Sequence, residues 1–150
     1  MSYEANRMRF EKIKCQEIAQ ELLGMEYKMG GRGKDKKIDC YGILCYFFDC
    51  FAVRLPDYSY IENWDDKEEH YLKEYSSTFR RLEEKEKPEP GDVILFRNME
   101  GASNHAGVYI GDGEFIHSIR KIGTKISRLR ERPWKEKQNG FYRLKKEERE

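Results

Sequence analysis

The spacing of hydrophobic and polar residues changes part-way along this chain. Over Tyr3–Met25 the apolar residues recur three, four and seven positions apart, with Lys and Glu between them. This spacing predicts an amphipathic helix that ends at Gly24. From Asp92 onward apolar and polar residues alternate instead, which predicts short strands.

A second helix is predicted over Cys40–Val53, with Asp39 as its N-cap and Pro56 ending it. Its apolar residues surround the helix almost completely, so we expect it to be buried: Ile43, Leu44, Phe47, Phe48 and Phe51. The preceding stretch, Gly30–Asp35, has three glycines in four residues and is predicted to be a loop.

The predicted strands cover Val93–Phe96, His105–Ile110, Glu114–Ser118, Lys125–Leu129 and Phe141–Leu144. Helices followed by antiparallel strands indicate an α+β fold, and residues 1–150 are expected to form a single domain. Residues 57–88 are interpreted as an irregular or helical insertion, with an exposed helix over Asp65–Tyr75. The charged tail, residues 145–150, is expected to be solvated.

Composition excludes some functions. Lys and Arg total 29 against 28 acidic residues, and a net charge of +1 gives no general attraction to nucleic acid. No apolar run approaches the roughly 20 residues of a membrane helix, so membrane insertion is not expected. The polar start, Met1–Lys14, predicts synthesis in the cytoplasm without a signal peptide. Four cysteines without a Cys-x-x-Cys pair predict free thiols in a reducing compartment.

One cysteine lies at a position that suits a nucleophile. Cys40 follows the glycine-rich loop and begins the apolar helix, where unpaired backbone N–H groups favour a thiolate. A cysteine in an apolar helix is more often a packing residue, and Cys45 and Cys50 are interpreted in that way. Cys40 is therefore the candidate nucleophile.

Two of the three histidines lie on neighbouring predicted strands. His105 would be the general base and His117 the group that orients it. A two-residue turn between the strands would put the two rings on opposite faces. A three-residue loop over Gly111–Gly113, or a bulge of equal count, puts Gly107 opposite His117. The histidines then lie one diagonal step apart, at about 7–8 Å between backbones.

Two other readings of the histidines are weaker. His70 lies in a charged stretch and is interpreted as a solvated helix residue. A zinc site at Cys40, His105 and His117 would lack a closed fourth ligand and a water-activating glutamate. We therefore expect no metal and no cofactor.

In combination, these motifs resemble the NlpC-type family of bacterial and phage cell-wall cysteine peptidases, a branch of the papain-like fold. The matching segments are Tyr27–Gly31, Asp39–Gly42, Pro90–Asp92, His105–Gly111 and Phe115–His117. The resemblance implies a papain-like fold in which N-terminal helices, including the nucleophile helix, pack on an antiparallel sheet from the C-terminal half. The stretch Asp39–Ser59 is similar to members carried with phage tails.

The resemblance implies hydrolysis of a peptide bond in peptidoglycan stem peptides, near γ-D-glutamyl. Cys40 would attack, His105 would be the base and His117 would orient it. Tyr27 and the Cys40 backbone N–H would stabilise the oxyanion. Asp39 would help bind the substrate amine, and Tyr41, which replaces a serine common in the family, would narrow that side of the pocket.

Three functions stay open. The first is a peptidase with stem peptides as substrate and phage tail proteins as partners, acting in the periplasm or cell wall when a phage particle carries it. The second is a tail assembly or tip protein with weak or no activity, for which the aromatic segment Tyr58–Trp64 would suit a partner. The third is a thiol acyltransferase, for which the sequence has no apolar lipid-binding segment. An intact triad favours the first and third.

Overall fold

The computed structural model describes residues 10–56, 78–97 and 103–145. The predicted helix over Asp65–Tyr75, the aromatic segment Tyr58–Trp64, His70 and most of the charged tail lie outside these residues. The helices are α2 (Lys12–Leu22), α3 (Cys40–Asp49), α5 (Trp134–Lys137) and a 3₁₀ turn (Lys34–Lys36). The strands are β1 (Glu26–Tyr27), β2 (Lys37–Ile38), β3 (Phe79–Arg81), β4 (Val93–Arg97), β5 (Ser103–Gly111), β6 (Glu114–Ile119), β7 (Gly123–Arg128) and β8 (Gln138–Leu144).

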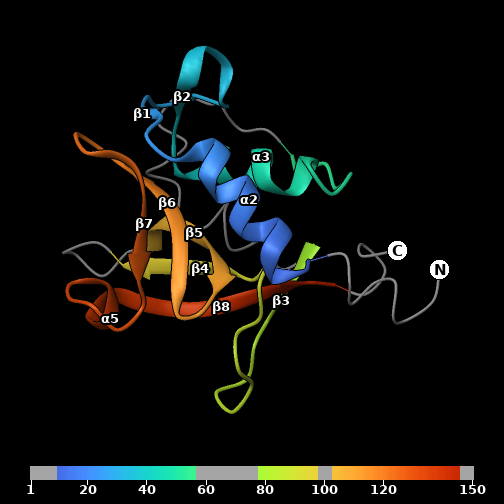
Figure 1. The fold of residues 1–150 in the computed structure, drawn as a ribbon. Helices are drawn as coiled ribbons and strands as arrows, with labels where there is room; N and C mark the ends of the chain where they lie inside the picture. Colours follow the sequence, from blue (N-terminus) through green and yellow to red (C-terminus); the bar gives the residue numbers. More distant parts are fainter. Residues whose placement is uncertain (1–9, 57–77, 98–102, 146–150) are drawn as a thin grey trace.

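Six strands form one antiparallel sheet in the order β3-β8-β4-β5-β6-β7. Helices α2 and α3 lie over one face of this sheet (Figure 1), and the main hydrophobic core fills the space between them. A smaller aromatic cluster contains Ile94, Phe96 and Phe115, with Trp134 packed against it. The α+β prediction is confirmed, as are all five predicted strands, to within a few residues at their ends.

The N-terminal helix is shorter than predicted in the part of the chain that the structure describes. Helix α2 begins at Lys12 and ends at Leu22. Its buried residues have the predicted helical spacing and face the sheet: Cys15, Ile18, Ala19 and Leu22. No helix among the described residues is long and apolar enough to cross a membrane.

Helix α3 begins as predicted and ends earlier. The Asp39 carboxylate accepts a hydrogen bond from the Gly42 N–H at 2.7 Å, which confirms the N-cap. The helix ends at Asp49 rather than at Val53, because Ala52 adopts a left-handed conformation with φ 60°. The Val53 N–H then bonds back to the Phe48 carbonyl, a C-terminal capping pattern. The helix therefore ends well before Pro56.

Three short strands and a one-turn helix were not predicted. Strands β1 and β2 pair in parallel on either side of the glycine-rich loop and place Tyr27 beside Ile38. Strand β3 lies in the region interpreted as irregular or helical and pairs with β8 at the edge of the sheet. Helix α5 is a single turn. The β1–β2 pair brings Tyr27, a predicted oxyanion donor, close to the start of α3.

The β5–β6 hairpin uses a bulge. Gly111 pairs with Glu114, so the turn contains two residues and the predicted three-residue loop is wrong. Tyr109 pairs with Phe115, and the register shifts between Tyr109 and Gly111, which leaves Ile110 as the extra residue. A bulge of this kind adds the one residue that the predicted histidine pair requires.

Candidate active site

The two histidines predicted to form a pair lie within hydrogen-bond distance. His105 on β5 and His117 on β6 approach with Nε2 of His105 2.8 Å from Nδ1 of His117. The rings therefore share one face of the hairpin, as predicted. Gly107 makes this possible, because a Cβ there would lie 2.9 Å from Cδ2 of Phe115 and 3.2 Å from Cβ of His117.

The hydrogen-bonded series continues onto the next strand. Nε2 of His117 lies 2.8 Å from Oγ of Ser127, and both residues are buried. Ser127 is on β7, two residues beyond Lys125, the residue that pairs with His117. Sequence reasoning missed Ser127, because one serine in a strand carries no recognisable signal.

Aromatic side chains enclose the histidine pair. Trp134 stacks on His105 with ring centroids 5.7 Å apart and meets His117 edge-on at 4.6 Å. Phe96 packs on both histidine rings, and Phe115 packs on His117. Sequence reasoning did not identify Trp134 as part of the site.

This enclosure lowers the pKa of both imidazoles. Burial, and then the Lys137 charge, lower the pKa of His105 from 6.5 to about 4. Burial, then His105 and Lys125, lower the pKa of His117 well below 6.5. Both rings are therefore neutral at neutral pH, as a base that must accept a proton requires.

Cys40 is the first residue of α3 and is buried. Helix α3 packs against β5 and β6, the two strands that carry the histidines. The Ser118 hydroxyl donates to the Ile38 carbonyl at 3.0 Å, which ties β6 to the segment just before Cys40. The start of α3 is thus held beside the hairpin. The predicted role of His105 as base requires it to lie within hydrogen-bond reach of Cys40, and this contact stays a prediction.

The other cysteines differ from Cys40 in their surroundings. None of the four forms a disulfide, as predicted. Burial raises the pKa of Cys15 to about 12, which makes its thiol a poor nucleophile. Cys45 packs against the main core, whereas Cys50 is exposed. The interpretation of Cys50 as a packing residue was therefore wrong, because its side chain is exposed at the end of α3.

Tyr27 is half-buried near the start of α3. Burial is the main cause that raises the pKa of its phenol, and the nearby Cys40 thiol raises it further. The Arg120 guanidinium lies 5.8 Å from the ring centroid and opposes this shift. The phenol therefore keeps its proton and can donate a hydrogen bond. Its role at the oxyanion stays a prediction.

The Asp39 carboxylate binds other groups of the protein. Oδ1 accepts from the Gly42 N–H and from Nη1 of Arg32 at 2.9 Å, and Oδ2 accepts from the Gly30 N–H at 2.7 Å. Burial raises the pKa of Asp39, and the Arg32 charge opposes the rise. Asp39 therefore joins the helix start to the glycine-rich loop. A role in binding substrate stays a prediction.

The Tyr41 side chain is buried. Its hydroxyl donates to the Pro56 carbonyl at 2.5 Å, and Arg32 lies 5.4 Å from its ring centroid. The side chain thus joins α3 to the segment that follows it. Its role in narrowing the substrate pocket stays a prediction.

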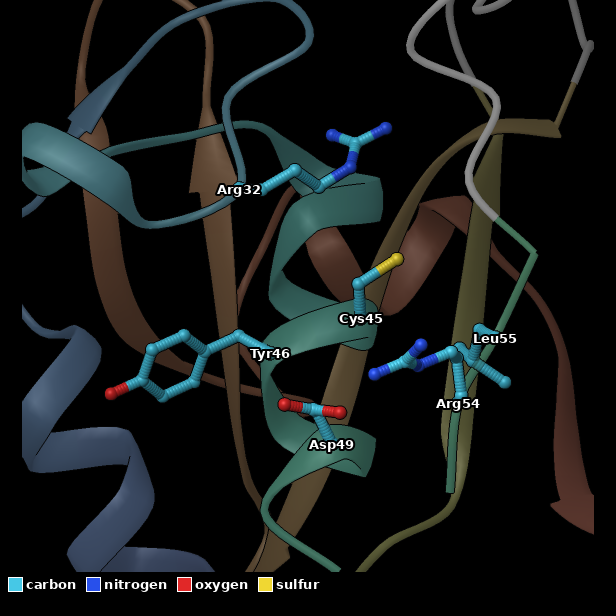
Figure 2. A pocket seen from close by; sticks show the side chains of 6 residues that line it. All are labelled: Arg32, Cys45, Tyr46, Asp49, Arg54 and Leu55. Carbon is cyan, nitrogen blue, oxygen red and sulfur yellow. The ribbon is translucent and has the colours of Figure 1, made fainter. Parts of the chain in front are cut away.

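A cavity of about 400 Å³ lies along α3, and neither His105 nor His117 lines it. In Figure 2 the Cys45 thiol points into it, between Arg32 and Arg54, which come from the segments on either side of the helix. Asp49, Tyr46 and Leu55 complete its lining. Because none of the predicted catalytic residues lines this cavity, we do not assign the reaction to it. Among the described residues no three His, Cys, Asp or Glu side chains cluster as metal ligands would.

Comparison with known proteins decides the family. The family model described as NlpC/P60 matches residues 24–143, which include Cys40, both histidines and Ser127. The chain belongs to the NlpC/P60 family. The sequence resemblance to this family is confirmed.

Curated relatives of this NlpC/P60 chain include a gamma-DL-glutamyl hydrolase of Bacillus subtilis, 32% identical over 84% of the chain and 28% of the relative. Murein DD-endopeptidase MepS/Murein LD-carboxypeptidase of Escherichia coli is 32% identical over 81% of the chain and 56% of the relative. Tail tip assembly protein K of phage lambda is 24% identical over 86% of the chain and 65% of that protein. The chain thus spans only part of the length of these relatives.

Solved structures show the same fold. An NlpC/P60 family protein from Bacillus cereus superposes with a TM-score of 0.67 at 23% identity, over 89% of this chain and 40% of that one. The papain-like α+β fold expected from the sequence is therefore confirmed. In it the helix that starts at Cys40 packs on the antiparallel sheet of the C-terminal half.

Proposed function

We propose that this NlpC/P60 chain is a cysteine peptidase that hydrolyses a peptide bond in bacterial peptidoglycan stem peptides, near γ-D-glutamyl. The observation that carries the proposal is the hydrogen-bonded pair His105–His117, held beside the start of the helix that Cys40 begins. The names of two relatives, a γ-DL-glutamyl hydrolase and a murein endopeptidase, support the substrate class.

In the proposed mechanism Nδ1 of His105 is the base, because Nε2 is already bonded to His117. The Cys40 sulfur attacks the carbonyl carbon while Nδ1 accepts the thiol proton. The C–N bond then breaks, and the proton passes from Nδ1 to the leaving amine, which leaves a thioester. Water attacks the thioester with His105 again as base, and the thiol is restored. Tyr27 and the Cys40 N–H would donate to the oxyanion.

We further propose that a free amine on the substrate matters little to this protein. The Asp39 carboxylate already has an internal cation at Arg32, and the Tyr41 hydroxyl already bonds to Pro56. The kcat/KM values for stem peptides with free and blocked N-termini should therefore be similar in the wild type. Replacing Tyr41 with the family's serine should restore a preference for the free amine. If blocking leaves both proteins unaffected, Tyr41 does not determine specificity.

A phage particle as carrier is also a proposal. The similarity to tail tip assembly protein K supports it, and it would bring a protein made in the cytoplasm to the periplasm or cell wall. Co-purification of the protein with tail particles, tested by immunoblotting, would support this route. Particles that lack the protein and keep full wall-degrading activity would contradict it.

The activity itself is tested with purified peptidoglycan. Wild-type protein should release peptides whose masses identify the cleaved bond, and Cys40→Ala should release none. Cys45→Ala, a cysteine change in the same helix, is the matched control and should keep activity. A folded wild type that cleaves neither the wall nor stem peptides would favour the tail structural protein. Products joined to an added amine instead of water would favour the acyltransferase.

A further inference from the structure

The hydrogen-bonded series at the site does not end at the second histidine. It runs from His105 to His117 and on to Ser127, with 2.8 Å at each step. Ser127 is buried, with 6% of its surface exposed. Among the described residues its hydroxyl has one hydrogen-bond partner, Nε2 of His117.

Proton positions along this series are linked. A neutral imidazole carries one N–H, so one ring nitrogen donates and the other accepts. If Nε2–H of His105 donates to Nδ1 of His117, then the proton of His117 must be on Nε2 and must be donated to Ser127. In this arrangement Nδ1 of His105 is bare and can take a proton.

The opposite arrangement would block the base. If Nδ1–H of His117 donated to Nε2 of His105, the proton of His105 would have to be on Nδ1. That nitrogen could then accept nothing from a thiol. Only the state in which the Ser127 oxygen accepts from His117 is compatible with catalysis by His105.

We propose that Ser127 is a positioning residue that holds His117 in the tautomer with its proton on Nε2. Its oxygen accepts that N–H in a site where the aromatic rings leave His117 buried. Without the oxygen, the N–H would be buried without a partner, which is costly and favours moving the proton to Nδ1. This inference rests on the proposed peptidase function for its kinetic effect but not for the tautomer itself.

Three variants on β7 test this role. Ser127→Ala removes the acceptor. Ser127→Thr keeps a hydroxyl and should therefore restore kcat. Thr124→Val is the matched control, because Thr124 is also buried on β7 and its hydroxyl has no hydrogen-bond partner among the described residues. We expect Ser127→Ala to lower kcat about tenfold with little change in KM, and Thr124→Val to leave both unchanged.

The tautomer can be measured directly by ¹⁵N NMR on protein labelled at histidine. The chain has three histidines, so the spectrum can be assigned with single substitutions. In the wild type at pH 7.5 the proton of His117 should be on Nε2, and in Ser127→Ala its population should shift toward Nδ1. A wild-type proton on Nδ1 would overturn the proposal, as would an unchanged tautomer in Ser127→Ala.

Thiol reactivity separates this inference from the function. Site-resolved mass spectrometry would follow alkylation of Cys40 by iodoacetamide, with exposed Cys50 as an internal reference. Ser127→Ala should slow alkylation at Cys40 but not at Cys50. One outcome is a wild type that cleaves no peptidoglycan while the tautomer and the reactivity change in Ser127→Ala are both observed. That result would contradict the proposed function and support the role of Ser127. Equal alkylation of Cys40 in wild type and Ser127→Ala would overturn that role.

Discussion

Replacing Gly107 with alanine should disturb the histidine pair more than the fold. The new Cβ would lie 2.9 Å from Cδ2 of Phe115, 3.0 Å from the Ile116 carbonyl oxygen and 3.2 Å from Cβ of His117. The carbonyl belongs to the paired strand and cannot easily move. Phe115 is held by Phe96, with ring centroids 5.0 Å apart. The strain must therefore reach His117.

The size of the effect follows from these contacts. Forcing a methyl group into a packed site costs about 1–3 kcal/mol, so the free energy of unfolding should fall by that amount. Misplacement of a catalytic group by about 1 Å costs roughly a hundredfold in rate. A shift of a few tenths of an ångström at His117 should therefore lower kcat about tenfold or more.

Gly113→Ala is the matched control on the same hairpin. Gly113 has φ +76° and nothing within 4 Å of a new Cβ, so alanine there meets backbone strain but no neighbour. That strain should cost about 1 kcal/mol of stability and leave kcat unchanged. Urea unfolding and stem-peptide hydrolysis would be measured for both variants. A Gly107→Ala protein with wild-type kcat would refute the claim that this glycine makes room for the histidine pair.

Four further predictions concern the same site. Cys40→Ala should abolish turnover with little loss of stability, whereas Cys45→Ala should cost packing energy and keep turnover; activity assays and urea unfolding separate the two. His105→Ala should lower kcat more than His117→Ala, because His105 transfers the proton and His117 only orients His105. Equal losses in steady-state kinetics would contradict this order. The folded-state pKa of both histidines lies below the unfolded value of about 6.5. As the pH falls toward 4, the unfolded chain therefore binds more protons than the folded protein does. Stability should therefore decrease over that range by up to about 1.4 kcal/mol per pH unit for each histidine, and His117→Gln should show a shallower slope in urea titrations at pH 7.5 and 5. Asp39→Ala should lower the unfolding free energy by about 2–4 kcal/mol, because a helix cap and a buried charge pair are lost together; Asp39→Asn should cost less, and equal losses would mean that the cap is unimportant.

Local sequence patterns predicted much of this molecule. The Asp39 cap, the buried helix after it and the strands with alternating residues depend on neighbours in the sequence, and all are present. The requirement for one extra residue in the hairpin came from counting positions between His105 and His117. The bulge at Ile110 meets that requirement.

What could not be predicted depends on contacts between distant segments. Ser127 became part of the site because β7 pairs with β6 in one particular register. Trp134 reaches both histidines from a one-turn helix that has no periodic pattern. Strand β3 forms because β8 offers it an edge, and the end of α3 depends on the left-handed Ala52.

The most direct test of the proposed chemistry is acid quenching during the first turnover of a stem peptide, followed by peptide mass mapping. If Cys40 is the nucleophile, the peptide that contains it should carry the mass of the acyl group, with peptides that contain Cys15, Cys45 or Cys50 unmodified. The adduct and the product should both be missing in Cys40→Ala. Hydrolysis by Cys40→Ala at the wild-type rate, or an adduct on another residue, would contradict the assignment.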